Sequence, residues 1–298
     1  MSKRKLLKIV QHIREASTYY LVNLYKNVGR HHVFLYSGGL AFSLFICLMP
    51  FILILFSVLG LLLNNESIQI RLISVLDTII PYSRYTDPIK DVIFARVQEI
   101  QNYRAVAGSI GVVGLFVAAS GFFSSLRTIL NKIFGVSKGK HMVVGKLRDM
   151  GMIFFLMFVF LVMSILLPLL NSIFNYVQHK IGLEHPLSVI QAFILHVSVP
   201  LTVIVIFYLF YKMIPYEKID RKTALVSAFS AAILWKLAEE LFRFFITHFA
   251  SLNRIYGAYM FLIVVVFWIY YSGIVFIVAA EIGQLYRLRR DSQYHEPE

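Results

Sequence analysis

Four ionisable residues lie in the middle of an otherwise apolar stretch, residues 223–248. They are Lys236, Glu239, Glu240 and Arg243, and spacings of three, four and seven place them on one face of a helix. Ionised side chains are costly at bilayer depth, so they usually face the interior of a helix bundle or a water-filled cavity. We therefore predict that this charged stripe faces inward and forms a polar pathway or a site for a headgroup.

A self-neutralised stripe is the alternative interpretation. Lys236 can pair with Glu240, and Glu239 with Arg243, because the members of each pair are four residues apart. The stripe would then only fix how its helix packs. Two pairs on one helix leave hydrogen-bonding capacity unused in a dry interior, which is costly. The residues themselves leave both interpretations open.

Polar residues also mark the ends of two other apolar stretches. Arg127 and Asn131 share a helical face with Ser120 and Ser124, whose small side chains favour close helix packing. Glu281 lies near the end of the last apolar stretch, on a helix expected to run in the same direction as that of Arg127. We therefore predict that Arg127 and Glu281 are close enough to interact and that Arg127, Asn131 and Glu281 contribute to the polar pathway.

The elements that must position these residues are transmembrane helices. The chain has 298 residues, of which 58% are hydrophobic and 15% charged, against about 25% charged in soluble proteins. Roughly 20 apolar residues span a bilayer as a helix, and none of the apolar stretches has the alternation of a barrel strand. The fold class is therefore predicted to be all-α and polytopic. Six stretches are long enough to cross: 39–63, 106–126, 151–174, 187–211, 223–248 and 257–285.

The distribution of Lys and Arg predicts the orientation. Segments 1–38, 127–150, 212–222 and 286–298 together carry 20 of these residues, whereas the three intervening loops carry 7. Cytoplasmic loops carry the excess of Lys and Arg, so both termini are predicted to be cytoplasmic. The net charge of +13 is then explained by anionic headgroups of the inner leaflet, and no nucleic-acid partner is expected. The single cysteine, Cys47, excludes an intrachain disulfide.

Two segments outside the predicted spans also have helical patterns. Residues 3–28, within the basic leader 1–38, have the pattern of an amphipathic interfacial helix, and a short solvated basic helix is the alternative. Residues 64–105 have apolar residues at helical spacing, broken by Pro81 and Pro88. This outer loop is predicted to be helical, either capping the bundle or docking a partner. Residues 39–285 would form the membrane domain, followed by a cytoplasmic tail, 286–298.

Three prolines fall within predicted spans: Pro50, Pro168 and Pro200. Proline removes a backbone hydrogen bond, so each is predicted to kink its helix. A static kink is the commoner result, whereas transporters use such breaks to expose backbone groups to a substrate.

Four stretches, read together, carry a family resemblance. The four are SGGLAFSLFICLMPFILILFSVLG (37–60), GVVGLFVAASGFFSSLRTILNKIFG (111–135), PYEKIDRKTALVSAFSAAILWKLAEELF (215–242) and YGAYMFLIVVVFWIYYSGIVFIVAAEIGQ (256–284). The fourth stretch is the most specific, because it combines YGA, a central Trp and a terminal Ala-Glu. The four stretches resemble the YihY/BrkB family of bacterial inner-membrane proteins. The resemblance implies six helices, a cytoplasmic-membrane location and a role in transport or envelope integrity.

Members of that family have been labelled virulence factor, serum-resistance protein and ribonuclease BN. Two-metal hydrolysis needs clustered His, Asp and Glu ligands, and the nine histidines form no H-x-H-x-D or H-E-x-x-H pattern. Neither a G-x-x-x-x-G-K-[ST] loop nor a G-x-S-x-G elbow is present. We therefore expect no catalytic residue, no metal site and no cofactor.

Three functional hypotheses follow. The first is a transporter or flippase-like protein for an amphiphilic or anionic envelope solute, which includes a lipid-linked one. The second is an envelope scaffold or assembly factor that transports nothing. The third, a membrane enzyme such as a ribonuclease, has the least support from the residues. Expected partners are membrane lipids, anionic inner-leaflet headgroups and further copies of the chain, whose small-residue helix faces allow self-association.

Overall fold

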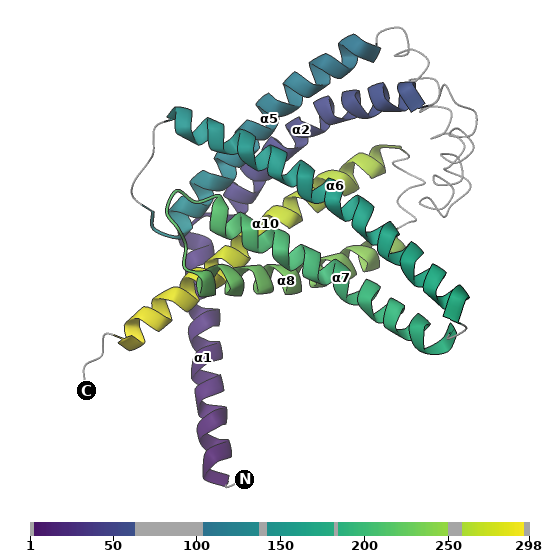
Figure 1. Cartoon of the computed structure of the whole chain (residues 1–298). Coiled ribbons are helices and arrows are strands. Elements are labelled where there is room, and N and C mark those ends of the chain that lie inside the picture. The colour runs from purple at the N-terminus through teal and green to yellow at the C-terminus, as the bar shows by residue number, and fades with distance from the viewer. Residues whose placement is uncertain (1–2, 63–103, 137–141, 182–183, 250–257, 295–298) are drawn as a thin grey trace. The chain divides into compact units, whose positions relative to one another are not determined.

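The computed structural model describes residues 3–62, 104–136, 142–181, 184–249 and 258–294 (Figure 1). Within these ranges every regular element is an α-helix, as predicted. The helices are α1 (Lys3–Arg30), α2 (Val33–Leu62), α5 (Arg104–Ile133), α6 (Met142–Ile181), α7 (Glu184–Met213), α8 (Arg221–Phe249) and α10 (Ala258–Tyr294). The predicted outer loop, 64–105, lies almost wholly outside the described residues, so its helical character stays a prediction.

The helices after α1 coincide with the six apolar stretches of the sequence, and α1 covers the amphipathic leader. Three of them are long and apolar enough to cross a membrane. The segments are Val33–Val58, Ala105–Ile133 and Leu262–Ser292, with mean hydropathies of 2.6, 2.0 and 2.5. A shorter apolar segment, Pro200–Met213, lies in α7. The chain is therefore a helical protein with membrane-spanning character, and the number of six crossings stays a prediction.

Two helix ends depend on a residue with positive φ. Gly135 follows α5 with a φ of 66°, and this left-handed backbone lets Val136 N–H donate to Asn131 O at 2.8 Å. His32, with a φ of 48°, lies between α1 and α2. Non-glycine residues adopt this conformation infrequently, so His32 marks a sharp joint between the two helices.

The described residues divide into two compact units. One contains Met1–Phe42 and Phe123–Glu298, and the other contains Ser43–Phe122. In the smaller unit, α2 and α5 pack through glycines of α5. A methyl group added at Gly111 would lie 3.0 Å from the Pro50 carbonyl oxygen, and one at Gly114 would lie 3.2 Å from Pro50 Cβ. Close contact of the two backbones therefore holds these segments together.

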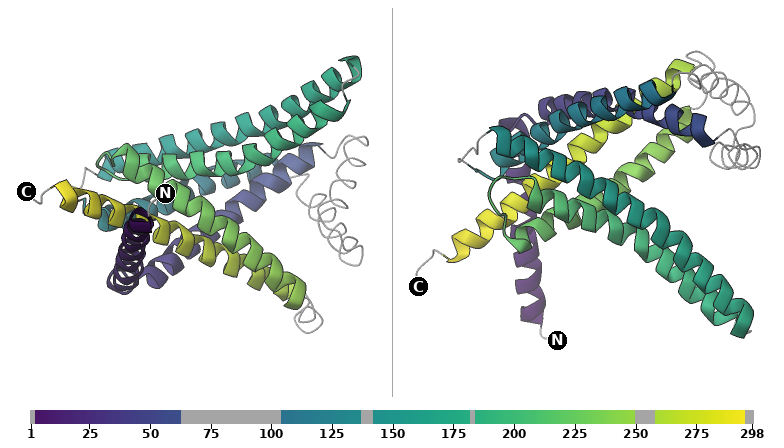
Figure 2. Two further views of the ribbon diagram at one scale, coloured as in Figure 1. Left: turned by 90° about the horizontal axis from the view of Figure 1, so that it is seen from below. Right: turned by 45° about the horizontal axis from the view of Figure 1, so that its top comes forward.

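The core of the larger unit is the contact between α8 and α10. Small residues form it on both helices, and all of them are fully or nearly fully buried: Ala224, Ala228, Ala231 and Ala238 on α8, with Ala279 and Ala280 on α10. Gly283 of α10 lies directly against Thr223 and Ser227 of α8. Helix α7 packs on α8, α6 and α7 run side by side as an antiparallel pair, and α1 contacts α10 (Figure 2).

Aromatic side chains continue this contact toward the other end of the two helices. Trp268 of α10 lies 5.4 Å, between ring centroids, from Trp235 and 4.5 Å from Phe242, both on α8. The buried Tyr211 of α7 donates a hydrogen bond to the carbonyl oxygen of Phe276 at 2.8 Å. Helices α7, α8 and α10 therefore form one packed group that positions the polar residues described next.

Candidate functional site

The charged stripe lies on α8 and is exposed. The side chains of Lys236, Glu239, Glu240 and Arg243 are 65%, 52%, 44% and 73% exposed. Lys236 Nζ lies 3.0 Å from Glu239 Oε2 and 3.8 Å from Glu240 Oε1, and Arg243 forms an ion pair with Glu240. The predicted pair between Lys236 and Glu240 is therefore present, and the stripe is neutralised along its own helix.

The prediction that these four charges are hidden inside the helix bundle is wrong for the chain as described. The small-residue face of α8, with Ala228 and Ala231, makes the contact with α10, and the stripe lies about a quarter turn away around the helix. Alanine and glycine let two helix backbones approach closely, whereas long charged side chains would hold them apart. The small residues therefore decide which face of α8 is buried.

Arg127 has a buried site of its own at the contact between α5 and α6. Its guanidinium forms an ion pair with Asp149, and the two side chains are 6% and 1% exposed. It donates a hydrogen bond to Gly145 O at 3.3 Å and lies over the ring of Tyr216, 5.1 Å from the centroid. A methyl group at Gly145 would lie 3.0 Å from both the Arg127 guanidinium and the Tyr216 hydroxyl, so these two groups meet over the glycine.

Asn131 lies one turn further along α5 and supports the same site. Its side-chain Oδ1 accepts a hydrogen bond from the backbone N–H of Tyr216 at 3.0 Å. This bond holds the short segment between α7 and α8 against α5, so Tyr216 stays over Arg127. The contacts of Arg127 therefore connect α5 with α6, and that of Asn131 connects α5 with the segment between α7 and α8.

Glu281 is fully buried in α10, and its partners come from α1 and the turn that follows it. Glu281 Oε1 accepts from His31 Nδ1 at 2.5 Å, and Oε2 accepts from Asn27 Nδ2 at 3.0 Å. The His31 side chain is 17% exposed, so the cluster is partly open to the surface at His31. His31, Asn27 and Asp149 are not among the residues predicted from the sequence. The adjacent histidines His31 and His32 in a basic leader were the one available signal.

The predicted contact between Arg127 and Glu281 is also wrong. Asp149 is the carboxylate partner of Arg127, whereas Glu281 bonds to His31 and Asn27. Arg127 lies near the end of α5, as expected, whereas α10 continues from Glu281 to Tyr294, and each residue faces a neighbour other than the predicted one. The spacing of residues within a helix does not say toward which neighbour the helix is turned.

The ends of α8 and α10 are joined by a third polar contact. Arg290 donates to Asp220 Oδ2 at 2.5 Å, and this hydrogen bond lowers the pKa of the Asp220 carboxyl below its usual value. Arg289 lies over the rings of Tyr19 and Tyr20 of α1, 5.7 and 5.9 Å from their centroids. The C-terminal part of α10 is thus tied both to the start of α8 and to α1.

All three prolines lie inside described helices, Pro50 in α2, Pro168 in α6 and Pro200 in α7. Kinks at the three positions stay predictions.

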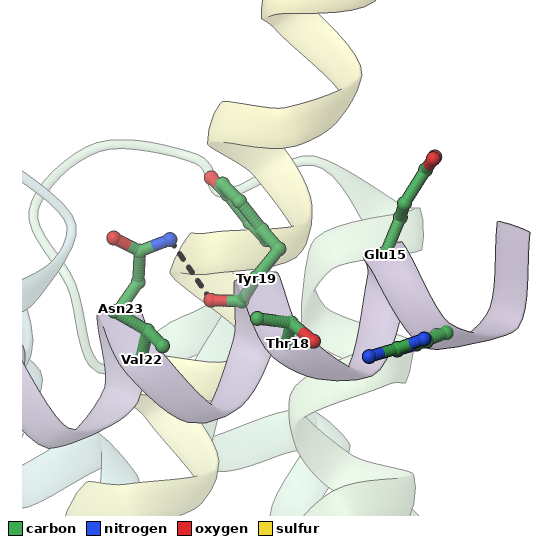
Figure 3. A pocket seen from close by; sticks show the side chains of 6 residues that line it. Glu15, Thr18, Tyr19, Val22 and Asn23 are labelled. Carbon is green, nitrogen blue, oxygen red and sulfur yellow. Dashed lines mark hydrogen bonds between the residues drawn. The ribbon is translucent and has the colours of Figure 1, made fainter. Parts of the chain in front are cut away.

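An open hollow of about 600 Å³ runs along α1 (Figure 3). Its lining includes Arg14, Glu15, Tyr19 and Asn23, and the Asn23 side chain donates to the Tyr19 carbonyl oxygen at 2.8 Å. A second hollow, of about 450 Å³, lies between Ser57 of α2 and residues of α5 near Gly108. Within the described part of the chain, no three His, Cys, Asp or Glu side chains gather as metal ligands.

A family model described as virulence factor BrkB matches residues 24–298 of the chain. The chain belongs to this family. The match covers all of the elements described above except the first part of α1, and it confirms the resemblance to YihY/BrkB proteins. No solved structure matches the chain.

Curated relatives of this BrkB-family chain are named membrane proteins. A UPF0761 membrane protein of Pseudoalteromonas atlantica is 26% identical over 83% of this chain and 78% of its own length. One of Chlorobium phaeobacteroides is 27% identical over 86% of this chain but only 55% of its own length. The chain therefore spans about half the length of that relative. The ribonuclease-like protein YfkH of Bacillus subtilis is 25% identical over 66% of this chain.

Proposed function

We propose that this BrkB-family protein is a transporter or flippase-like protein of the bacterial inner membrane that handles an amphiphilic or anionic envelope solute. It crosses the membrane six times, with both termini on the cytoplasmic side, where the Lys- and Arg-rich segments meet anionic headgroups. The helices that cover the six apolar stretches, three of which are long and apolar enough to cross a membrane, and the relatives named membrane proteins support this assignment. The proposal assigns no catalytic residue, metal or cofactor.

The exposed stripe on α8 is the observation that carries the proposal. The four side chains lie in the middle of a helix whose other residues are mainly apolar, and each is at least 44% exposed. An ionised side chain at this depth is stable only beside water, another polar group or a headgroup. The stripe face of α8 would therefore line a polar groove and not a face covered by acyl tails.

The chemistry of the stripe suits a headgroup that carries negative or mixed charge. Lys236 and Arg243 can each hold a phosphate or carboxylate oxygen, and the arginine can do so through two parallel hydrogen bonds. Glu239 and Glu240 can accept from an amine or hydroxyl of the same headgroup. The intrahelical pairs would open as the solute's charges replace them, so the resting stripe stays neutral.

Lipid movement in reconstituted vesicles tests this role. The full chain is placed in vesicles with headgroup-labelled phospholipid, and the loss of label on addition of a membrane-impermeant reductant is followed. We expect the triple variant Lys236→Met, Glu239→Gln, Glu240→Gln to reduce the rate at least about tenfold, which corresponds to about 1.4 kcal/mol of lost stabilisation. Lys222→Met, at the exposed start of the same helix, is the matched control and should leave the rate unchanged.

An envelope scaffold is the second candidate, and the ion pairs along α8 favour it. Lys236 and Glu239 are already paired at 3.0 Å, so the stripe can be a neutralised surface against another protein or a second copy of the chain. Under that function, the triple variant would fold normally and lipid movement would be equal in wild-type, variant and protein-free vesicles. That result would remove the stripe from a transport mechanism.

A further inference from the structure

Two buried carboxylates, Asp149 and Glu281, are neutralised by groups of different chemistry. Asp149 pairs with Arg127, whose guanidinium keeps its charge at every physiological pH. Glu281 has His31 as its partner, and histidine is the side chain that gains and loses a proton between about pH 5 and 8. The first contact is therefore permanent, whereas the second depends on whether a proton is bound.

The protonation state of His31 decides the stability of the Glu281 cluster, which consists of Glu281, His31 and Asn27. Both carboxylate oxygens are used, one by His31 Nδ1 at 2.5 Å and the other by Asn27 Nδ2 at 3.0 Å. With the imidazole doubly protonated, the cluster is neutral. When that imidazolium releases one proton to solvent through its exposed side, Glu281 keeps a full negative charge that only neutral donors contact. A buried charge without a counter-charge is strongly disfavoured.

Four cations on the surrounding elements contact other groups. Lys132 of α5 donates to the Tyr36 hydroxyl at 2.6 Å, and Arg287 of α10 donates to the Phe134 carbonyl oxygen at 3.5 Å. Arg289 lies over Tyr19 and Tyr20 of α1, and Arg290 bonds to Asp220 before α8. The buried polar residues of α8 are Thr223 and Ser227, which carry no charge. Within the described residues, His31 is therefore the cation in contact with Glu281.

Because the cluster lies at the end of α1, the protonation state of His31 affects how α1 is held against α10. His31 lies between the last residue of α1, Arg30, and the left-handed joint at His32 that begins the turn into α2. The cluster and the contact of Arg289 with Tyr19 and Tyr20 are the polar and cation–π contacts described between α1 and α10. Loss of the Glu281 cluster would leave α1 held near its middle by the contact with Arg289, so that α1 would be free to turn at His32.

We propose that Glu281 and His31 form a proton-binding site that locks α1 against α10 when the proton is bound and releases it when the proton leaves. The site is stable while the imidazolium faces the carboxylate and loses its stabilising charge when that proton leaves. It responds to the pH of the side of the membrane that α1 faces. It does not depend on the transport role, because it requires no solute.

Distances between two spin labels measure the lock directly. The full chain carries Cys47→Ser, which removes its one cysteine, together with Ser17→Cys on α1 and Ser292→Cys on α10; both label positions are exposed. In lipid nanodiscs we expect one narrow distance distribution at pH 5.5. At pH 8.5 we expect a broader distribution with a second, different distance.

His31→Gln should give the broad distribution at both pH values, because a neutral side chain cannot supply the counter-charge. Glu281→Gln should also abolish the change with pH, because no buried charge remains to be compensated. His32→Asn is the matched control, since His32 is exposed and asparagine tolerates the left-handed backbone, and it should keep the wild-type response. A wild-type distribution that is equal at both pH values, or a pH response that survives in His31→Gln, would overturn the proposal.

Discussion

At the scale of single residues, the buried charges of the described segments are matched by groups from other elements. Arg127 and Asp149 are nearly inaccessible, and the guanidinium also donates to Gly145 O and lies over Tyr216. Such a pair contributes little net stability relative to apolar residues of similar size, but removal of one partner leaves an uncompensated buried charge. The value of the pair is therefore in specifying how α5 and α6 meet.

This asymmetry predicts the behaviour of three variants. Asp149→Leu leaves Arg127 charged without a carboxylate, and Arg127→Met leaves Asp149 without its cation. Each should lose about 3–5 kcal/mol of the free energy of unfolding, whereas the double variant should recover most of that loss. Chemical unfolding in detergent micelles measures all three. Additive losses in the double variant would show that the two charges do not stabilise each other.

At the scale of elements, α8 has two faces that differ in composition and in what they contact. One face has small residues and contacts α10, where Ser227 lies against Gly283, and the neighbouring face carries the exposed stripe. A methyl group at Gly283 would lie 1.8 Å from Ser227 Oγ and 3.2 Å from the Thr223 carbonyl oxygen. The distance between the two helices therefore depends on glycine at this position.

The packing predicts opposite effects for two identical substitutions. Gly283→Ala should destabilise the protein by about 1–3 kcal/mol, because the backbone of α8 must move away from α10. Gly151→Ala, in α6, has no atom within 4 Å of the added methyl and should stabilise its helix by about 0.5–1 kcal/mol. Apparent melting temperatures in one detergent compare the two. Ser227→Gly should partly rescue Gly283→Ala, and equal shifts for both alanine variants would contradict the close contact.

At the scale of the whole molecule, the chain is a BrkB-family helical protein in which three described helices meet the length and hydropathy of membrane spans. The lysines and arginines of the sequence divide 20 to 7 between alternate segments outside the predicted spans. This asymmetry predicts an even number of crossings, which would place α1 and the C-terminal part of α10 on the cytoplasmic side.

Chemical labelling in intact cells tests this topology. With Cys47→Ser as background, a single cysteine at Ser17 or at Ser292 should react with a membrane-impermeant maleimide only after the cells are permeabilised. A cysteine placed within 64–105, which the predicted topology puts outside, should react before permeabilisation. Labelling of either Ser17→Cys or Ser292→Cys in intact cells would reverse the assigned orientation.

The positions of the helices could be predicted from the sequence, because runs of apolar residues and the hydrogen bonding of a helix are local properties. The helix over the leader, the helices over the six apolar stretches and the pair between Lys236 and Glu240 were predicted from residue spacing, and three of those helices have the length and hydropathy of membrane spans. The family was evident from four stretches of sequence, and the family match confirms it.

Which faces of the helices meet depends on the packing between helices and not on the pattern within one helix. The rotation of α8 depends on its fit to the small residues of α10, so the stripe is exposed although its charges suggested burial. Arg127 pairs with Asp149 and Glu281 with His31, and no spacing in the sequence links the members of either pair. The charges on one helix indicate which side chains need a partner of opposite charge. The packing of neighbouring backbones decides which residue is that partner.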